Sequence, residues 1–220
     1  MPLGKRTKSY DVKRNVRQRR TPLYRTPLIS TPHKQTRKLR YFGRAAINAP
    51  AALSGVHVCA ANDLYDPDVT GVGHQPVGFD QMMEFYTHFK VLSSKITVWF
   101  TSEGNPGSPL MCAVSLKSVN TTGSSITRVI ENGDCSFDLK SNHALDPSKL
   151  TKSFNLDKWL PNQKYDQRTL GTSSSSPTEV AYYHINVEAL DGSSDPGSMI
   201  IGYVIDYVAE FTEKKQVNIS

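Results

Sequence analysis

The chain of 220 residues contains only three cysteines, Cys59, Cys112 and Cys135, which excludes most covalent or metal-bound frameworks. Their number is odd and no two form a C-x-x-C pair, so neither a disulfide-stabilised fold nor a zinc ribbon is expected. His57 lies two residues before Cys59, but a single His-x-Cys pair lacks the other ligands of a metal site. We therefore expect free cysteines, no metal ion and no other cofactor.

Long apolar runs and the short motifs of common enzymes are also missing. No stretch of about eighteen apolar residues occurs, which excludes a transmembrane helix. No apolar run follows the charged N-terminus, so we expect no signal peptide. The patterns G-x-x-x-x-G-K-[ST], G-x-G-x-x-G, G-x-S-x-G and H-E-x-x-H are absent. The six histidines are scattered, and His184 is expected to be solvated on the polar face of a strand. These absences argue against an enzyme.

Acidic residues are almost missing from residues 1–44, where basic residues gather. This segment contains fourteen Lys or Arg and one Asp, a net charge of +13; the whole chain carries +6, which leaves −7 for residues 45–220. Such asymmetry is typical of a polyanion-binding arm on a globular body. Pro22, Pro27 and Pro32 exclude a helix, and the few apolar residues cannot offset the entropy of ordering, so we expect a disordered, extended arm. A solvated terminus without a partner is the alternative.

Aromatic residues lie among these cations, a combination that suits single-stranded nucleic acid. Cations hold the phosphates while aromatic rings stack on unpaired bases. Duplex binding through phosphates alone and a nuclear localisation signal are other uses of the same clusters. The residues expected to bind nucleic acid are Lys5, Arg6, Lys8, Lys13, Arg14, Arg17, Arg19, Arg20, Tyr24, Arg25, Lys34, Arg37, Lys38, Arg40, Tyr41 and Arg44.

The stretch Pro76–Ser102 combines two hydrophobic periods. Helical spacing predicts one apolar helix face, which begins after Gly78 and consists of Phe79, Met82, Met83, Tyr86 and Phe89. The period then drops to two, which predicts a half-buried strand whose apolar face is Leu92, Ile96, Val98 and Phe100. Its polar face is formed by Ser93, Lys95, Thr97 and Thr101, with Trp99 as an exception on that side.

Further strands are expected between turn signals along the rest of the chain. They cover residues 51–61, 109–119, 127–130, 136–140, 148–156, 180–190 and 199–211. The last two meet at the Gly/Ser/Asp-rich segment 191–197, which predicts an antiparallel hairpin. About eight strands, one short helix and no βαβ alternation predict an all-β fold, an eight-stranded antiparallel jelly roll or sandwich, over residues 45–220.

A basic arm leading into an all-β body resembles the capsid protein of circovirus-like viruses, whose genomes are circular single-stranded DNA. The resemblance rests on the arginine-rich start (residues 14–44), a P-x-G-F-D-Q-like segment and a Y-x-x-F-x-V-x-x-S-x-I-x-V-x-F strand. The residues that carry it are Pro76, Gly78, Phe79, Asp80, Tyr86, Phe89, Val91, Ser94, Ile96, Val98 and Phe100. Small positive-strand RNA viruses share a similar jelly roll and segment, so the type of genome stays open.

The resemblance implies a structural protein rather than an enzyme. Residues 45–220 would form the shell domain and assemble into a T=1 icosahedral capsid of about sixty copies. Residues 1–44 would package single-stranded DNA and engage a host nuclear import receptor, which places the protein in the virion and the host nucleus. The host attachment factor is not indicated. The competing hypotheses are a non-capsid nucleic-acid-binding or shuttle protein and an enzyme built on a β-sandwich.

Overall fold

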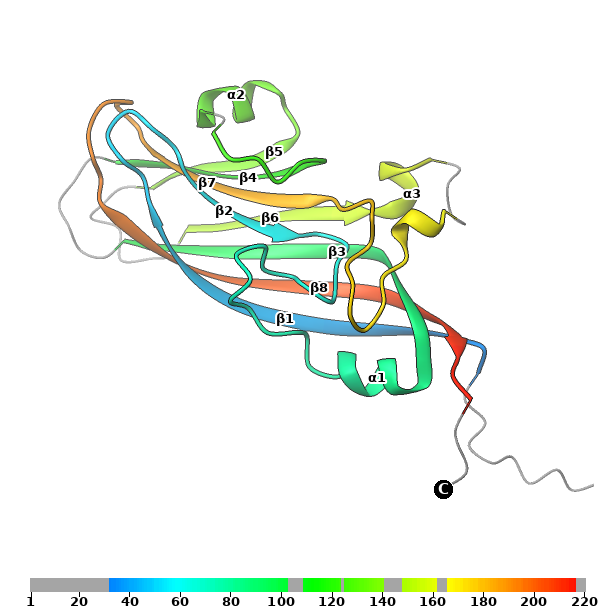
Figure 1. Cartoon of the computed structure of the whole chain (residues 1–220). Coiled ribbons are helices and arrows are strands. Elements are labelled where there is room, and N and C mark those ends of the chain that lie inside the picture. The colour runs from blue at the N-terminus through cyan, green and yellow to red at the C-terminus, as the bar shows by residue number, and fades with distance from the viewer. Residues whose placement is uncertain (1–31, 103–108, 124, 141–147, 162–165, 217–220) are drawn as a thin grey trace, which may run out of the picture. The chain divides into compact units, whose positions relative to one another are not determined.

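The computed structural model describes residues 32–102, 109–123, 125–140, 148–161 and 166–216. The chain divides into units 1–30 and 31–220, and all described residues belong to the second. Its strands form two four-stranded sheets packed face to face (Figure 1). The strands are β1 Lys34–Asn48, β2 Gly55–Ala60, β3 Tyr86–Ser102, β4 Leu110–Lys117, β5 Cys135–Lys140, β6 Ser148–Asn155, β7 Tyr182–Ala189 and β8 Ser198–Lys214.

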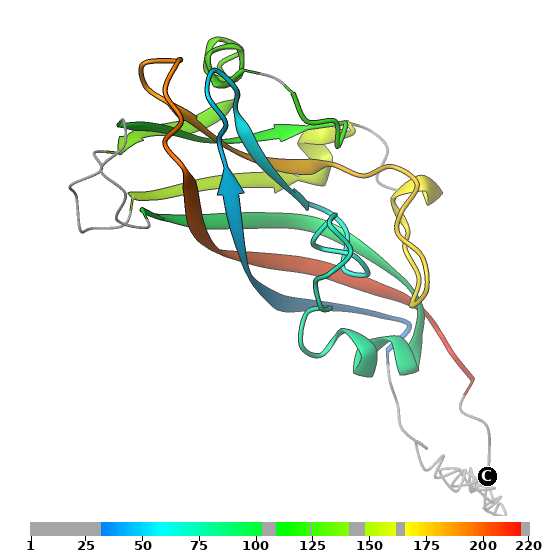
Figure 2. The same ribbon diagram turned by 60° about the vertical axis from the view of Figure 1, so that its left-hand side comes forward.

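Consecutive strands along the chain often lie in opposite sheets. One sheet has the order β1-β8-β3-β6 and the other β2-β7-β4-β5, all pairs antiparallel. Figure 2 shows the two layers with the crossing connections at their ends. This arrangement is the double-sheet jelly roll, so the predicted all-β, eight-stranded fold class is confirmed.

The predicted hairpin between the last two strands is wrong. β7 pairs with β2 and β4, whereas β8 pairs with β1 and β3. Both strands carry large inward side chains, and these fill the core from opposite sheets rather than from one. The connection 190–197 is long enough to cross the roughly 10 Å between packed sheets, which a two-residue hairpin turn is not.

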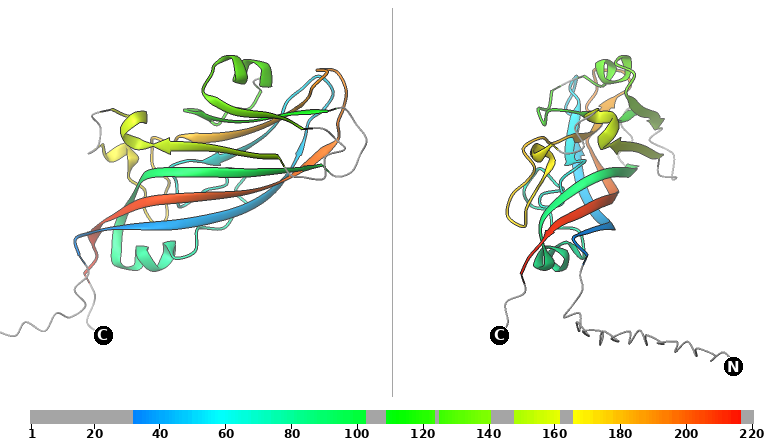
Figure 3. Two further views of the ribbon diagram at one scale, coloured as in Figure 1. Left: turned by 180° about the vertical axis from the view of Figure 1, so that it is seen from behind. Right: turned by 90° about the vertical axis from the view of Figure 1, so that its right-hand side faces the viewer.

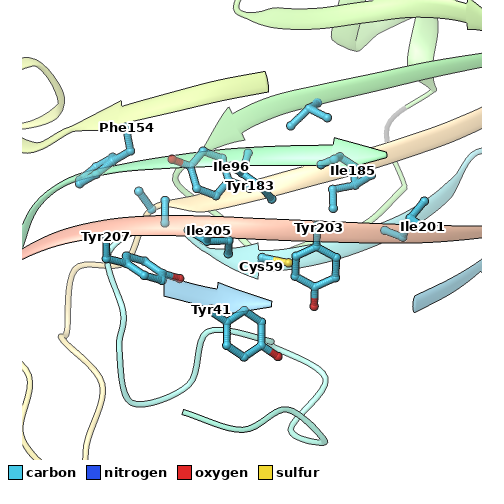
Figure 4. Close-up of a cluster of buried hydrophobic side chains, with 14 of the residues drawn as sticks. Tyr41, Cys59, Ile96, Phe154, Tyr183, Ile185, Ile201, Tyr203, Ile205 and Tyr207 are labelled. Atoms are coloured by element: carbon cyan, nitrogen blue, oxygen red, sulfur yellow. The ribbon is translucent and has the colours of Figure 1, made fainter. Parts of the chain in front are cut away.

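The core lies between the sheets and is filled by alternate residues of β8 and of the second half of β3. Every second residue of β8 from Met199 to Phe211 is buried, as are Ile96, Val98 and Phe100 of β3. Figure 4 shows the aromatic part of this core, with Cys59 of β2 beside the ring of Tyr203 of β8. Burial raises the pKa of the Cys112 thiol to about 12, and all three cysteines are free.

The helix in the Pro76–Ser102 stretch is shorter than its periodicity predicts. Helix α1 spans Phe79–Phe85 and begins after Gly78, whose φ of 91° lies in the left-handed region that favours glycine. Tyr86 and Phe89 are buried as expected, but they belong to β3, because this segment pairs with β8. Phe89 still meets the helix, with its ring edge-on to Phe79 at a centroid distance of 5.3 Å.

A β-bulge at Leu92 changes the face of this strand. Val91 pairs with Ala209 and Ser93 with Val208, so Leu92 is an extra residue without a partner in the ladder. The inward phase therefore moves by one residue, from Phe89 and Val91 before the bulge to Ser94 and Ile96 after it. The prediction that Leu92 shares the apolar face of Ile96 is wrong for this reason.

Two further predictions differ from the structure. The segment expected as a strand at 127–130 is helix α2, Ile126–Glu131, because Ile126 and Val129 pack at helical spacing and the Ser125 side chain accepts a hydrogen bond from the Thr127 amide. His184 is fully buried rather than solvated, since its Nε2 lies 2.8 Å from the Val119 carbonyl oxygen in the segment that crosses this face.

The remaining helical segments are short. They are α3, Leu156–Trp159, and the 3-10 turn η1, Gln167–Thr169. Within the described ranges no helix is both long and apolar enough to cross a membrane.

Candidate nucleic-acid interface

The C-terminal part of the expected arm is a strand of the sheet. β1 begins at Lys34 and pairs with β8 through Asn48, so the expected boundary after residue 44 falls inside β1. The strand forms here because Tyr41 and Ile47 face inward and are buried at 2% and 4% exposure. Residues 1–31, which hold Lys5, Arg6, Lys8, Lys13, Arg14, Arg17, Arg19, Arg20, Tyr24 and Arg25, lie outside the described residues, and their role stays a prediction.

Alternation along β1 separates its cations from its core residues. Arg37 shares the phase of Tyr41 but is exposed near the strand's start, where the core ends. Tyr41 cannot stack on a base, because its ring is buried 6.0 Å from Tyr203 and 4.8 Å from His74 between centroids. The site prediction for Tyr41 is therefore wrong. The residues of opposite phase, including Lys34, Lys38, Arg40 and Arg44, point outward.

Cations from three strands gather on the outer face of the β1-β8-β3-β6 sheet. The cross-strand register aligns Arg40 with Asp206 and Lys95 in one row, and Arg44 with Gly202 and Trp99 in another. The left panel of Figure 3 shows these four strands side by side. We call the exposed cations of this surface the basic face: Lys34, Lys38, Arg40 and Arg44 of β1, Lys95 of β3 and Lys149 of β6.

Acidic residues of the central strand β8 pair with two of these cations. The Arg40 guanidinium donates to both Asp206 carboxylate oxygens at 2.6 and 3.1 Å, which raises the pKa of Arg40. The Lys34 ammonium donates to Glu210 at 3.2 Å. Exposed pairs of this kind add little stability, but they orient the side chains. Among the described residues the other cations of the basic face have no carboxylate at salt-bridge distance.

The bulge in β3 separates two hollows on this surface. One of about 500 Å³ is lined by Lys38, Arg40 and Lys95 together with hydroxyl and amide groups of Ser93, Ser153 and Asn155. The other, of about 630 Å³, is lined by Lys34, Lys90 and Glu210 among others. Cations beside hydroxyl and amide donors suit phosphate oxygens. Carboxylates also line the hollows, Asp206 in the first and Glu210 and Glu213 in the second.

Four residues of this surface were not among the predicted binding residues. Lys95 and Lys149 add charge from other strands, and Phe42 and Trp99 add aromatic rings. Phe42 is 50% exposed, and the Lys149 ammonium lies 5.9 Å from the centre of the Trp99 ring. The signal was present, because Trp99 broke the polar face of its predicted strand and the run Lys38, Arg40, Phe42, Arg44 has a period of two. Only the pairing of β1 and β3 with β8 brings Trp99 and this run of residues onto one surface.

A buried polar cluster lies on the inner side of the same sheet. The Tyr203 hydroxyl donates to Asp68 at 2.8 Å and lies 3.1 Å from His57 Nε2, which is 3.6 Å from the Asp68 carboxylate. All three side chains are buried. The hollow beside the cluster is small, about 200 Å³, and is lined by His57 without Asp68 or Tyr203. Because the three side chains are buried and contact one another, we assign the cluster a structural role in holding the 62–75 loop.

This cluster makes stability depend on pH. Burial lowers the pKa of His57, and the nearby Asp68 carboxylate offsets only part of that effect. The unfolded chain takes up a proton near pH 6.5 that the folded chain resists, so the free energy of unfolding should fall as the pH drops below about 6.5. Burial lowers the pKa of His184 too, with the same sign.

Urea midpoints at pH 7.5 and 5.5 test this expectation. The midpoint should be lower at pH 5.5, and the difference should shrink in His57→Gln. Comparison with His57→Gln separates the effect of the His57 imidazole on stability from the effects of Asp63 and Asp66, whose pKa values are raised by burial. Equal midpoints at the two pH values in the parent chain would contradict the expectation.

Several solved viral structures resemble this chain at low sequence identity. The sequence matches no protein-family model and no curated protein. The fold is similar to the BFDV capsid protein solved as a 60-mer (13% identity, 87% of this chain and 99% of that chain, TM-score 0.49). It is also similar to the structure of turnip yellow mosaic virus, with 10% identity over 85% of this chain and 98% of that chain and a TM-score of 0.44. A further similar structure is that of Macrobrachium rosenbergii nodavirus, with 9% identity over 100% of this chain and 63% of that chain and a TM-score of 0.49. Likeness at this level assigns no family, so function rests on this chain's own residues.

Proposed function

We propose that the protein is a structural capsid subunit that assembles with copies of itself into a small shell and packages a single-stranded nucleic acid genome. The observation that carries this proposal is the basic face of a jelly-roll sheet, continuous in sequence with the basic residues 1–33. A surface of this kind neutralises phosphates without reading sequence. The negative charge of residues 45–220 limits binding elsewhere on the body.

The charge arithmetic supports packaging. Residues 1–44 carry a net +13, so a closed shell of about sixty copies would bring several hundred positive charges to its genome. That is the order needed to offset a substantial part of the charge on one to two thousand nucleotides, on the order of one charge each. In the circovirus-like form of the proposal the genome is circular DNA. The clusters before residue 26 would also engage a nuclear import receptor of the host.

Self-association is supported by an apolar pair on an edge strand. β5 is the outer strand of its sheet, and Phe137 and Leu139 each remain 55% exposed on it. Exposed edge strands with large apolar side chains are sites where chains pair. We infer that this edge contacts a neighbouring copy in the shell.

Electron microscopy of the purified chain tests the proposal. We expect uniform particles of roughly 20 nm, the size of a shell of about sixty such subunits, that protect nucleic acid from nuclease. Phe137→Lys with Leu139→Lys should abolish particles and leave the melting temperature of the subunit nearly unchanged. Val72→Lys with Val77→Lys is a matched control, because it also charges two exposed apolar residues but lies in the loop before α1.

The second candidate, a nucleic-acid-binding protein that forms no shell, is favoured by the same basic face. It predicts soluble small oligomers that bind nucleic acid and leave it open to nuclease. That result would overturn the capsid proposal. If particles do form, they can be opened and the protected nucleic acid treated with nucleases; digestion by ribonuclease alone would show that the genome is RNA rather than DNA.

A further inference from the structure

The basic face contains an open position in its last row, between Arg44 and Trp99. Gly202 is half-buried on β8, and a Cβ placed there would meet no atom within 4 Å. The outward neighbours along the strand, Ile200 and Val204, carry side chains, so the opening is one row wide. Across the sheet Gly202 pairs with Arg44 of β1 and with Trp99 of β3. The opening therefore has a guanidinium on one side and an indole on the other.

The dimensions of this opening suit a planar ring. Neighbouring strands lie about 4.8 Å apart, which places Arg44 and Trp99 about 9–10 Å apart across the glycine. A ring stacked between two planes needs about 3.5–4.0 Å on each side, or roughly 7–8 Å in total. Outward side chains stand nearly perpendicular to a sheet, so both flanking groups can present a face to a ring lying over Gly202.

The charges around this opening select an anionic ligand with aromatic rings. Lys149 lies in the same row as Trp99, and its ammonium is 5.9 Å from the ring centre. Arg44 stands at the other end of that row, and Phe42 is exposed one row away on β1. Nucleobases stack on tryptophan and on arginine, while lysine and arginine hold the adjoining phosphates.

We propose that the space above Gly202 receives one unpaired base of a single-stranded nucleic acid, stacked between the Arg44 guanidinium and the Trp99 indole, with Lys149 on an adjoining phosphate. This inference rests on the proposed function and extends it, because it moves part of genome binding from the arm to the folded body. Stacking is insensitive to base identity, so the site takes any sequence. A paired base cannot enter, since its faces are covered by its neighbours in the duplex.

Tryptophan fluorescence tests this site directly. The other tryptophan is Trp159 of α3, whose ring lies beside that of Phe154 of β6. The substitution Trp159→Phe therefore leaves Trp99 as the only tryptophan reporter in the full chain. The probes are a thymidine oligomer of about thirty nucleotides, which spans several binding positions, and an abasic oligomer with the same phosphates. We expect the thymidine oligomer to quench Trp99 and the abasic oligomer to bind with little quenching. A uridine oligomer of the same length distinguishes RNA from DNA.

A variant that fills the opening provides the second readout. Gly202→Val should lower affinity for the thymidine oligomer about tenfold, the effect of losing one stacked base, and leave affinity for the abasic oligomer unchanged. Thr97→Val is the matched control, since it places the same side chain on the next row of the face. Melting curves of both variants verify the fold; if Gly202→Val fails to fold, the comparison of the two oligomers on the parent chain decides.

Equal quenching by the two oligomers, or unchanged thymidine affinity in a folded Gly202→Val, would overturn the proposal. Lost particle assembly in Gly202→Val without any change in quenching would show a contact between copies instead, and would overturn it as well. The two proposals can fail separately. If Trp99 shows base-dependent quenching but no particles form, the capsid proposal is overturned and the base-binding site stands. If particles protect nucleic acid but Trp99 shows no such quenching, only the base-binding site is overturned.

Discussion

Neutralising Arg14, Arg17, Arg19 and Arg20 to glutamine should weaken nucleic-acid binding and flatten its salt dependence. Each phosphate contact on a single strand contributes about 0.7 to the slope of log affinity against log salt concentration. Losing four contacts should therefore reduce the slope by about 3. Affinity for a thymidine oligomer is measured from low to moderate salt, and the nucleic acid content of particles is measured in parallel.

The matched control neutralises four cations of the body that are not members of the basic face. They are Lys117 of β4, Arg128 of α2, Lys158 of α3 and Arg168 of η1. This variant keeps the total charge change and should keep the slope of the parent chain. An identical slope for parent and arm variant would refute the role of the arm, whereas equal losses in both variants would show that only net charge matters.

The largest loss of stability is expected from Phe100→Ala in β3. Its ring is fully buried between the sheets, and removing a buried aromatic side chain costs about 3–5 kcal/mol. For a domain of this size that corresponds to a melting temperature lower by roughly 6–20 °C. Phe79→Ala should cost a similar amount, because its ring is fully buried at the start of α1 and meets Phe89 edge-on.

Phe42→Ala is the control for these core variants. The same side chain is removed, but Phe42 is half-exposed on the outer face of β1, so the change should stay within about 0.5 kcal/mol. Thermal unfolding followed by circular dichroism gives all three values. A melting temperature equal to that of the parent chain for Phe100→Ala or Phe79→Ala would mean that the core is misplaced.

The basic face shows how far sequence patterns reach toward a site. The alternation Lys38, Arg40, Phe42, Arg44 is visible in the chain, yet the low apolar content of residues 1–44 favoured an arm over a strand. Burial of Tyr41 and Ile47 reverses that preference, because β8 supplies a partner for the whole strand. Lys95 and Lys149 join the face only through this pairing, since they lie far apart in sequence.

The amino-acid sequence by itself determined most of the strands after residue 50, most of their inward residues and the concentration of charge at the N-terminus, but neither β1 nor α2. These features depend on local periods and composition, which a single chain displays directly. The tertiary structure decided which sheet receives β7 and β8, where α1 gives way to β3, and how the bulge at Leu92 shifts the inward face. The reason is physical: alternating apolar residues satisfy a strand in either sheet, and the free energy that distinguishes the partners comes from contacts between residues distant in sequence.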